Sequence, residues 1–166
     1  MMLSKEIQEY IDAWVNKFPS GRQRSAVIAA LHKTQDSNKG FLTVELMDAV
    51  ANYLSIPAMQ VYEVASFYSM FETKKVGRHS VSICTNISCM LNGSDELIDY
   101  TQKKLGINIG ESTDDGKFYL KQEEECLAAC CGAPMMMVDH KYYENLTTKD
   151  IDDILDIIFK DYCIGK

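Results

Sequence analysis

Four cysteines in two closely spaced pairs are the residues of this chain best suited to chemistry. Four residues separate Cys84 from Cys89, and three separate Cys126 from Cys130. Together they supply four thiolates, the complete ligand set of either a [2Fe-2S] cluster or a structural zinc ion. Zinc-binding pairs usually lie on knuckle-like turns, and the combination of these two spacings is less typical of them. The pattern favours an iron–sulfur cluster, with zinc as the alternative.

Two further cysteines bear on the choice of ligands. Cys131 directly follows Cys130 and would give the second pair the same spacing as the first. Adjacent side chains usually point in different directions, so one of these two residues is a bystander, and the spacing does not choose between them. Cys163 is expected beyond the last helix, as an ordinary free thiol.

Composition and charge narrow the class of protein. The chain has 166 residues, of which 46% are hydrophobic, enough for one globular domain or two small ones. The sequence shows neither a signal peptide nor an apolar run of about 20 residues, so we expect a cytoplasmic protein. In that compartment closely spaced cysteines bind metal more often than they form disulfides. The net charge of -7 argues against a nucleic-acid partner.

The elements that must position the cysteines fall into two halves. Up to about residue 72, apolar residues recur at three- and four-residue spacing without strand-like alternation, which predicts a small helical bundle. Within it Ser20 and Gln23 match a capping box, while Thr43 and Pro57 fit the starts of two later helices.

The second half predicts a mixed α/β layer with the order β-α-β-β-β-α. Strands are expected at 79–84, 117–121 and 134–138, with a hairpin into Tyr142 and Tyr143; helices are expected at 95–105 and after a cap at Thr148. Cys84 then ends the first strand, Cys89 lies in the loop after it, and the second pair lies between the next two strands. Both pairs are therefore expected at one end of the sheet.

Small or polar residues flank both pairs, which allows backbone amides to approach and donate to the sulfurs. These residues are Asn86, Ser88, Gly93 and Gly132.

Longer sequence motifs around the cysteines and upstream of them match those of a known family. They are Cys84-Thr85-Asn86-x2-Cys89, Glu125-Cys126-Leu127-Ala128-Ala129-Cys130, Ala133-Pro134-Met135, Tyr142-Tyr143-Glu144-Asn145-Leu146-Thr147 and, upstream, Val61-Tyr62-Glu63-Val64-Ala65-Ser66-Phe67-Tyr68. Over nearly its whole length the chain resembles the 24-kDa-type [2Fe-2S] subunit of respiratory complex I, the NADH:quinone oxidoreductase.

The resemblance implies a fold and a ligand set. The implied fold is α/β, with an N-terminal helical bundle over residues 1–75 and a thioredoxin-like [2Fe-2S] ferredoxin domain over residues 76–166. The implied cluster ligands are Cys84, Cys89, Cys126 and Cys130, which makes Cys131 the bystander.

The resemblance also implies a function. The chain would be an electron-transfer subunit, without catalytic residues of its own, whose cluster exchanges single electrons with the FMN of a partner flavoprotein subunit that binds NADH. No Gly-x-Gly-x-x-Gly fingerprint occurs in the sequence, which agrees with nucleotide binding by the partner. The other peripheral-arm subunits would attach it to the cytoplasmic membrane. The alternatives are the equivalent subunit of an NAD-linked hydrogenase or formate dehydrogenase and, in a different class, a zinc-stabilised interaction module.

Overall fold

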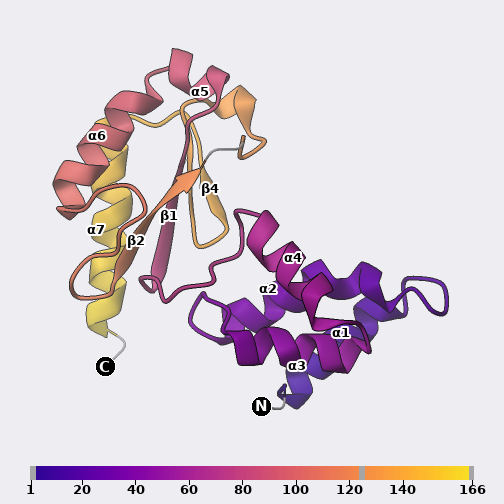
Figure 1. The fold of residues 1–166 in the computed structure, drawn as a ribbon. Coiled ribbons are helices and arrows are strands. Elements are labelled where there is room, and N and C mark those ends of the chain that lie inside the picture. The colour runs from indigo at the N-terminus through magenta and orange to yellow at the C-terminus, as the bar shows by residue number, and fades with distance from the viewer. Residues whose placement is uncertain (1–2, 124–125, 165–166) are drawn as a thin grey trace. The chain divides into compact units, whose positions relative to one another are not determined.

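The chain forms two compact units, Met1–Val76 and Gly77–Lys166, and each has its own hydrophobic core. The computed structural model describes residues 3–123 and 126–164 (Figure 1). Within these residues, no helix combines the length and the hydropathy that a bilayer span requires.

The first unit is helical. Its elements are α1 (Lys5–Val15), the 3-10 turn η1 (Gln23–Ala26), α2 (Val27–Ser37), α3 (Val44–Leu54) and α4 (Ala58–Phe67). Each α-helix contributes fully buried side chains to one core, among them Ile11, Leu31, Val50 and Val61. Thr43 caps α3 as predicted, because its side chain accepts a hydrogen bond from the Leu46 N–H.

The capping box predicted at Ser20 and Gln23 is wrong. The chain turns through Gly21 at φ +80°, and the next element begins as a 3-10 turn with Arg22 in the cap position and no side-chain cap. A capping residue must lead directly into helical backbone, and the left-handed glycine separates Ser20 from it.

The second unit is a mixed α/β layer. Its elements are β1 (His79–Cys84), α5 (Ile87–Leu91), α6 (Ser94–Leu105), β2 (Phe118–Glu123), the 3-10 turn η2 (Cys130–Gly132), β3 (Met136–Val138), β4 (Lys141–Tyr143) and α7 (Thr148–Ile164). The strand order is β2-β1-β3-β4, with β1 and β2 parallel and the other pairs antiparallel. The predicted order of strands and helices is confirmed, with the short helix α5 as an addition.

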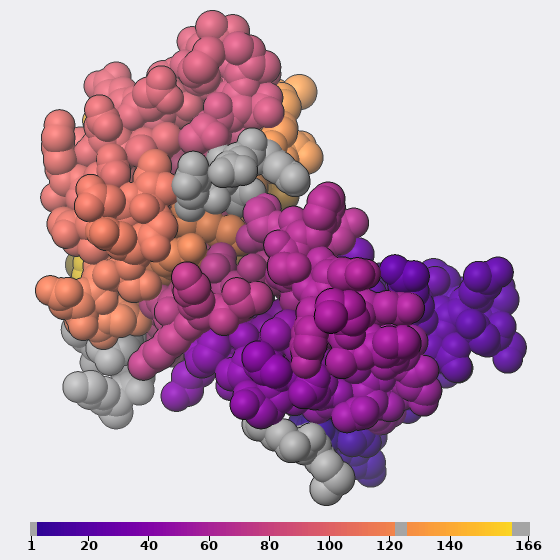
Figure 2. All heavy atoms as spheres, in the orientation of Figure 1, coloured from indigo at the N-terminus to yellow at the C-terminus, as the bar shows by residue number. Residues whose placement is uncertain are grey.

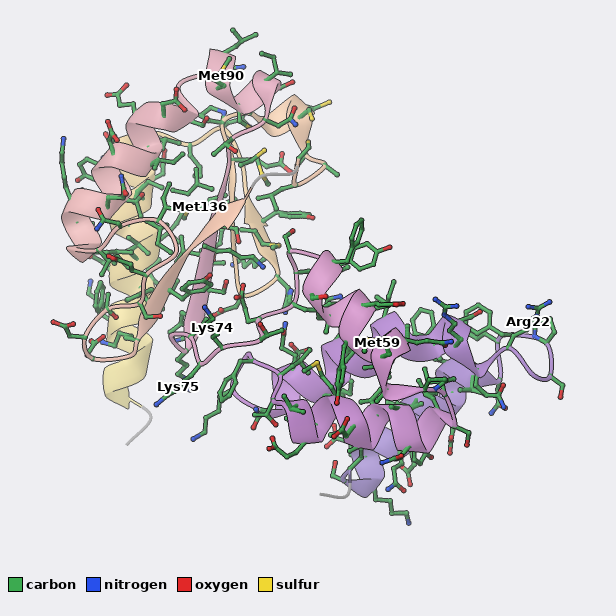
Figure 3. All side chains as sticks on the ribbon, in the orientation of Figure 1. Arg22, Met59, Lys74, Lys75, Met90 and Met136 are labelled. Atoms are coloured by element: carbon green, nitrogen blue, oxygen red, sulfur yellow. The ribbon has the colours of Figure 1, made fainter. Side chains whose placement is uncertain are left out.

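One face of the sheet holds the core of this unit. Val81 lies opposite Leu120 on β2 and Val138 on β3, and all three are buried. Helices α6 and α7 lie side by side against this face (Figure 1), and Met136 lies among the same core residues (Figure 3). Because side chains alternate along a strand, Cys84 and Met135 belong to the opposite face.

Polar contacts join the two helices that cover the core face. The Lys104 ammonium donates to Asp152 at 2.5 Å and to Asp156 at 3.0 Å, and the Tyr100 hydroxyl donates to Asp152 at 2.7 Å. The lysine and tyrosine bonds lower the pKa of the Asp152 carboxyl, which keeps it charged beside the ammonium.

The start of the sheet unit requires a glycine. A Cβ on Gly77 would lie 2.4 Å from the backbone carbonyl of Phe118, so no other residue fits there without displacing β2.

Two predictions about the last helix need correction. Thr148 is the first residue of α7 rather than its cap. The capping interaction is made by Thr147, whose N–H and hydroxyl both donate to the Asp150 carboxylate. Cys163 lies within α7 and not beyond it.

The surface of the second unit includes α5 and α6, which are coloured rose in the space-filling view (Figure 2). Met90 points away from the sheet in Figure 3, and its neighbour Leu91 is 75% exposed. The helix that follows Cys84 therefore has one buried side, at Cys89, and one apolar side in solvent.

We predict that Leu120→Ala destabilises the sheet unit by about 3 kcal/mol, because it leaves a cavity in a closed core. Leu91→Ala is the matched control, and we expect it to change the free energy of unfolding by less than about 0.5 kcal/mol because its side chain is exposed. Urea unfolding followed by circular dichroism measures both, and equal losses would contradict the core described here.

Candidate metal centre

The first cysteine pair is held by a strand end and a short helix. Cys84 is the last residue of β1, and Cys89 lies in α5 instead of the predicted loop. The Asn86 side chain accepts a hydrogen bond from the Ile87 N–H and starts the helix. This turn of helix points Cys89 back towards the strand, and both cysteines are only 1% exposed.

The second pair lies in the segment between β2 and β3. Cys126 is half-buried, and Cys130 is exposed at the first position of η2. Their sulfurs are 3.2 Å apart. Cys131 is also exposed and follows Cys130 within η2.

The first pair and Cys126 of the second pair meet at Met135. This fully buried side chain packs with Cys84 and Cys89, and Cys126 packs against the same small cluster. The backbone N–H of Cys84 donates to the Met135 carbonyl at 3.2 Å, which fastens the end of β1 to the segment entering β3. Cys84, Cys89 and Cys126 thus lie together at one end of the sheet, and the Cys130 sulfur lies beside that of Cys126.

The electrostatics of the first pair disfavour negative charge. Burial raises the pKa of the Cys89 thiol to about 11, and its hydrogen bond with Cys84 acts in the same direction. A backbone hydrogen bond with Met135 acts the other way, and nearby Cys84 and Cys126 raise the pKa further. Since metals bind thiolates, a positive metal centre must supply the charge that this site lacks.

The four sulfurs are arranged as two close pairs. Among residues 3–123 and 126–164, no three His, Cys, Asp or Glu side chains gather as a ligand group for a single metal ion.

The predicted roles of the flanking residues are only partly right. The one backbone amide found donating to a second-pair sulfur, within the described residues, belongs to Ala128 and not to a residue chosen from the sequence. Gly132 is needed for packing, because a Cβ there would lie 2.5 Å from the Glu144 Cβ and 2.3 Å from its carboxylate. The Gly132 carbonyl also accepts from the Asn145 N–H at 2.7 Å.

These contacts anchor the second-pair segment to the end of the β3–β4 hairpin. Sequence reasoning missed the importance of Met135 and Glu144. The signal for Met135 was available, since it precedes a strand whose alternation turns it away from the core. Nothing local marked Glu144, because its contact joins segments that are apart in the chain.

Fold and site together define a thioredoxin-like iron–sulfur protein. Residues 11–158 match the family described as thioredoxin-like [2Fe-2S] ferredoxin, and the chain belongs to that family.

Named relatives agree with the resemblance seen in the sequence. The chain is 42% identical over 148 residues to an NADH-quinone oxidoreductase subunit of Rickettsia felis, a match that covers 89% of this chain and 88% of the relative. It is 44% identical over 142 residues to the mitochondrial NADH dehydrogenase [ubiquinone] flavoprotein 2 of Dictyostelium discoideum, covering 86% of this chain and 57% of the relative.

Solved structures share the fold. An NAD+-reducing [NiFe]-hydrogenase in the air-oxidised state superposes with a TM-score of 0.69 at 21% identity, over 86% of this chain and 24% of that chain. The same enzyme type in the H2-reduced state gives a TM-score of 0.66 at 21% identity, over 81% and 22%. The chain spans about a quarter of the length of these hydrogenase chains.

We predict that Gly132→Ala displaces the second-pair segment and lowers the amount of cluster bound per chain, because the new methyl group overlaps the Glu144 side chain. Adding Glu144→Gly removes the overlapping Cβ and should restore cluster content. Iron and acid-labile sulfide per chain measure both variants. Full cluster content in Gly132→Ala, or no recovery in the double variant, would contradict this packing account.

Proposed function

We propose that this chain is the electron-transfer subunit of an NADH:quinone oxidoreductase, and that Cys84, Cys89, Cys126 and Cys130 ligate its [2Fe-2S] cluster. The observation that carries the proposal is the packing of Cys84, Cys89 and Cys126 around Met135, with Cys130 beside Cys126, in a chain of the thioredoxin-like [2Fe-2S] ferredoxin family. The relatives named as NADH-quinone oxidoreductase subunits support the assembly in which it works.

The donor set fits a two-iron cluster. Each iron of such a cluster takes two protein ligands, and the two cysteine pairs would supply one pair to each iron. Cys84 is hydrogen-bonded to Cys89, and the Cys126 and Cys130 sulfurs are 3.2 Å apart. When bound, the cluster supplies reversible transfer of one electron at a time.

The protein's own residues provide an uneven environment. Cys84, Cys89 and Met135 close one side against water, and burial there opposes added negative charge. Cys130, on the other side, is exposed and leaves the second pair accessible. This chain therefore contributes the protein environment of the cluster to the reaction, and it contributes no catalytic side chain.

We assign NADH and FMN to a partner flavoprotein subunit of the same complex. This chain carries no Gly-x-Gly-x-x-Gly fingerprint, and the names of its relatives place them in NADH-oxidising enzymes. It acts in the respiratory chain as one subunit of an oxidoreductase, without a complete active site. We propose that other peripheral-arm subunits hold it at the cytoplasmic face of the membrane.

We propose that the chain has two domains, a helical domain over residues 1–75 and a cluster-bearing domain over residues 76–166. The separate cores of the two compact units support it. The equivalent subunit of an NAD-linked hydrogenase or formate dehydrogenase would differ in the subunits that copurify with it, and a zinc module would differ in its metal.

We predict that replacing Cys84, Cys89, Cys126 or Cys130 by serine, one at a time, removes most of the [2Fe-2S] signal. A hydroxyl is a much poorer ligand than a thiolate for a soft iron–sulfur centre. Cys131→Ser is the matched control and should retain the cluster. Visible absorption, electron paramagnetic resonance of the reduced protein, and iron and sulfide content are measured after purification without oxygen.

The outcomes separate the alternatives. Retention in Cys130→Ser with loss in Cys131→Ser would move the fourth ligand to Cys131. Stoichiometric zinc without sulfide in the unaltered chain would overturn the cluster altogether. If the cluster is present but NADH does not reduce it in the copurified complex, the electron-transfer role fails.

A further inference from the structure

Ala128 has a backbone conformation that its side chain does not favour. It lies between Cys126 and Cys130 with φ +63°, in the left-handed region where a Cβ approaches the following carbonyl. Residues kept in such a conformation persist only where the surroundings require it, and they cluster at functional sites. The position of Ala128 therefore calls for a local reason.

The reason lies in the turn that joins Cys126 to Cys130. The left-handed φ of Ala128 turns the residues that follow it, and the Cys130 sulfur lies 3.2 Å from the Cys126 sulfur. Within this turn the Ala128 N–H donates to the sulfur of Cys126, at 3.3 Å between nitrogen and sulfur. Ala129 then accepts from the Gly132 N–H at 2.9 Å, which holds the rest of the segment in place.

An amide aimed at a ligand sulfur has an electrostatic consequence. The reduced form of a cluster carries one more negative charge than the oxidised form, and the positive end of an N–H dipole stabilises that charge. The first pair is buried in an apolar cluster with Met135, whereas Cys126 of the second pair is half-buried. The Ala128 N–H thus donates to a sulfur on the more open side of the site.

We propose that the Ala128 N–H, which donates to the Cys126 sulfur within this turn, raises the reduction potential of the centre. The inference rests on the proposed role of Cys126 as a ligand. It concerns one backbone amide of this chain.

The first test removes this N–H while keeping the side chain. Incorporating L-lactic acid at position 128 replaces the amide by an ester while keeping the methyl group and the chain path. We expect the midpoint potential of the holoprotein, from a dye-mediated titration followed by electron paramagnetic resonance, to shift to more negative values. Ala128→Gly is the matched control. It keeps the N–H and relieves the strain, so it should leave the potential unchanged and the melting temperature equal or higher.

The second test detects the Ala128 nitrogen beside the centre without removing its hydrogen bond to Cys126. In protein labelled with [15N]alanine, pulsed electron paramagnetic resonance of the reduced centre should show a 15N coupling that disappears in Ala128→Gly. This measurement decides the matter if the ester variant fails to hold a cluster.

Each result has a definite meaning. A cluster present in the ester protein with an unchanged potential overturns the role of Ala128, and so does an unchanged 15N coupling in Ala128→Gly. Neither result touches the proposed function. Absence of any cluster from the unaltered protein would instead overturn the proposed function itself.

Discussion

The pairing of β1 with β3 is the constraint on which the metal centre depends. The Cys84 N–H donates to the Met135 carbonyl just past the last paired residues, Ile83 and Met136. This bond fastens the strand that carries the first cysteine pair to the segment that follows the second pair. Without it, Cys84, Cys89 and Cys126, from two distant parts of the chain, would not share one small cluster around Met135. A shift of the register by one residue would exchange the two faces of β3.

Strand alternation separates the folding core from the metal centre. Val81 and Met136 point into the core that α6 and α7 cover, while Cys84 and Met135 occupy the other face at the same end of the same strands. The core can therefore be packed to full density without any of the four cysteine side chains. The centre itself is built from a strand end, one turn of helix and a loop, whose shapes depend on single polar contacts and on Gly132.

Much of this arrangement could be predicted from local patterns. Alternation identified β1, apolar spacing identified α6, and cap chemistry at Thr43 identified the start of α3. The errors share a physical cause, which is that a few residues of sequence do not determine a short element. The capping box at Ser20 failed because Gly21 takes a left-handed conformation, and Cys89 was placed in a loop although Asn86 starts a helical turn there.

The family, the two cysteine pairs and the order of strands and helices could all be predicted from the amino-acid sequence alone. Those properties depend on residue type, spacing and periodicity, which are local along the chain. The folded structure was needed to show that Met135 joins Cys126 to the first pair, that Gly132 must make room for Glu144, and that the Ala128 N–H donates to Cys126. These contacts depend on which segments pack together and on the backbone angles of the loop, and the spacing of the cysteines determines neither.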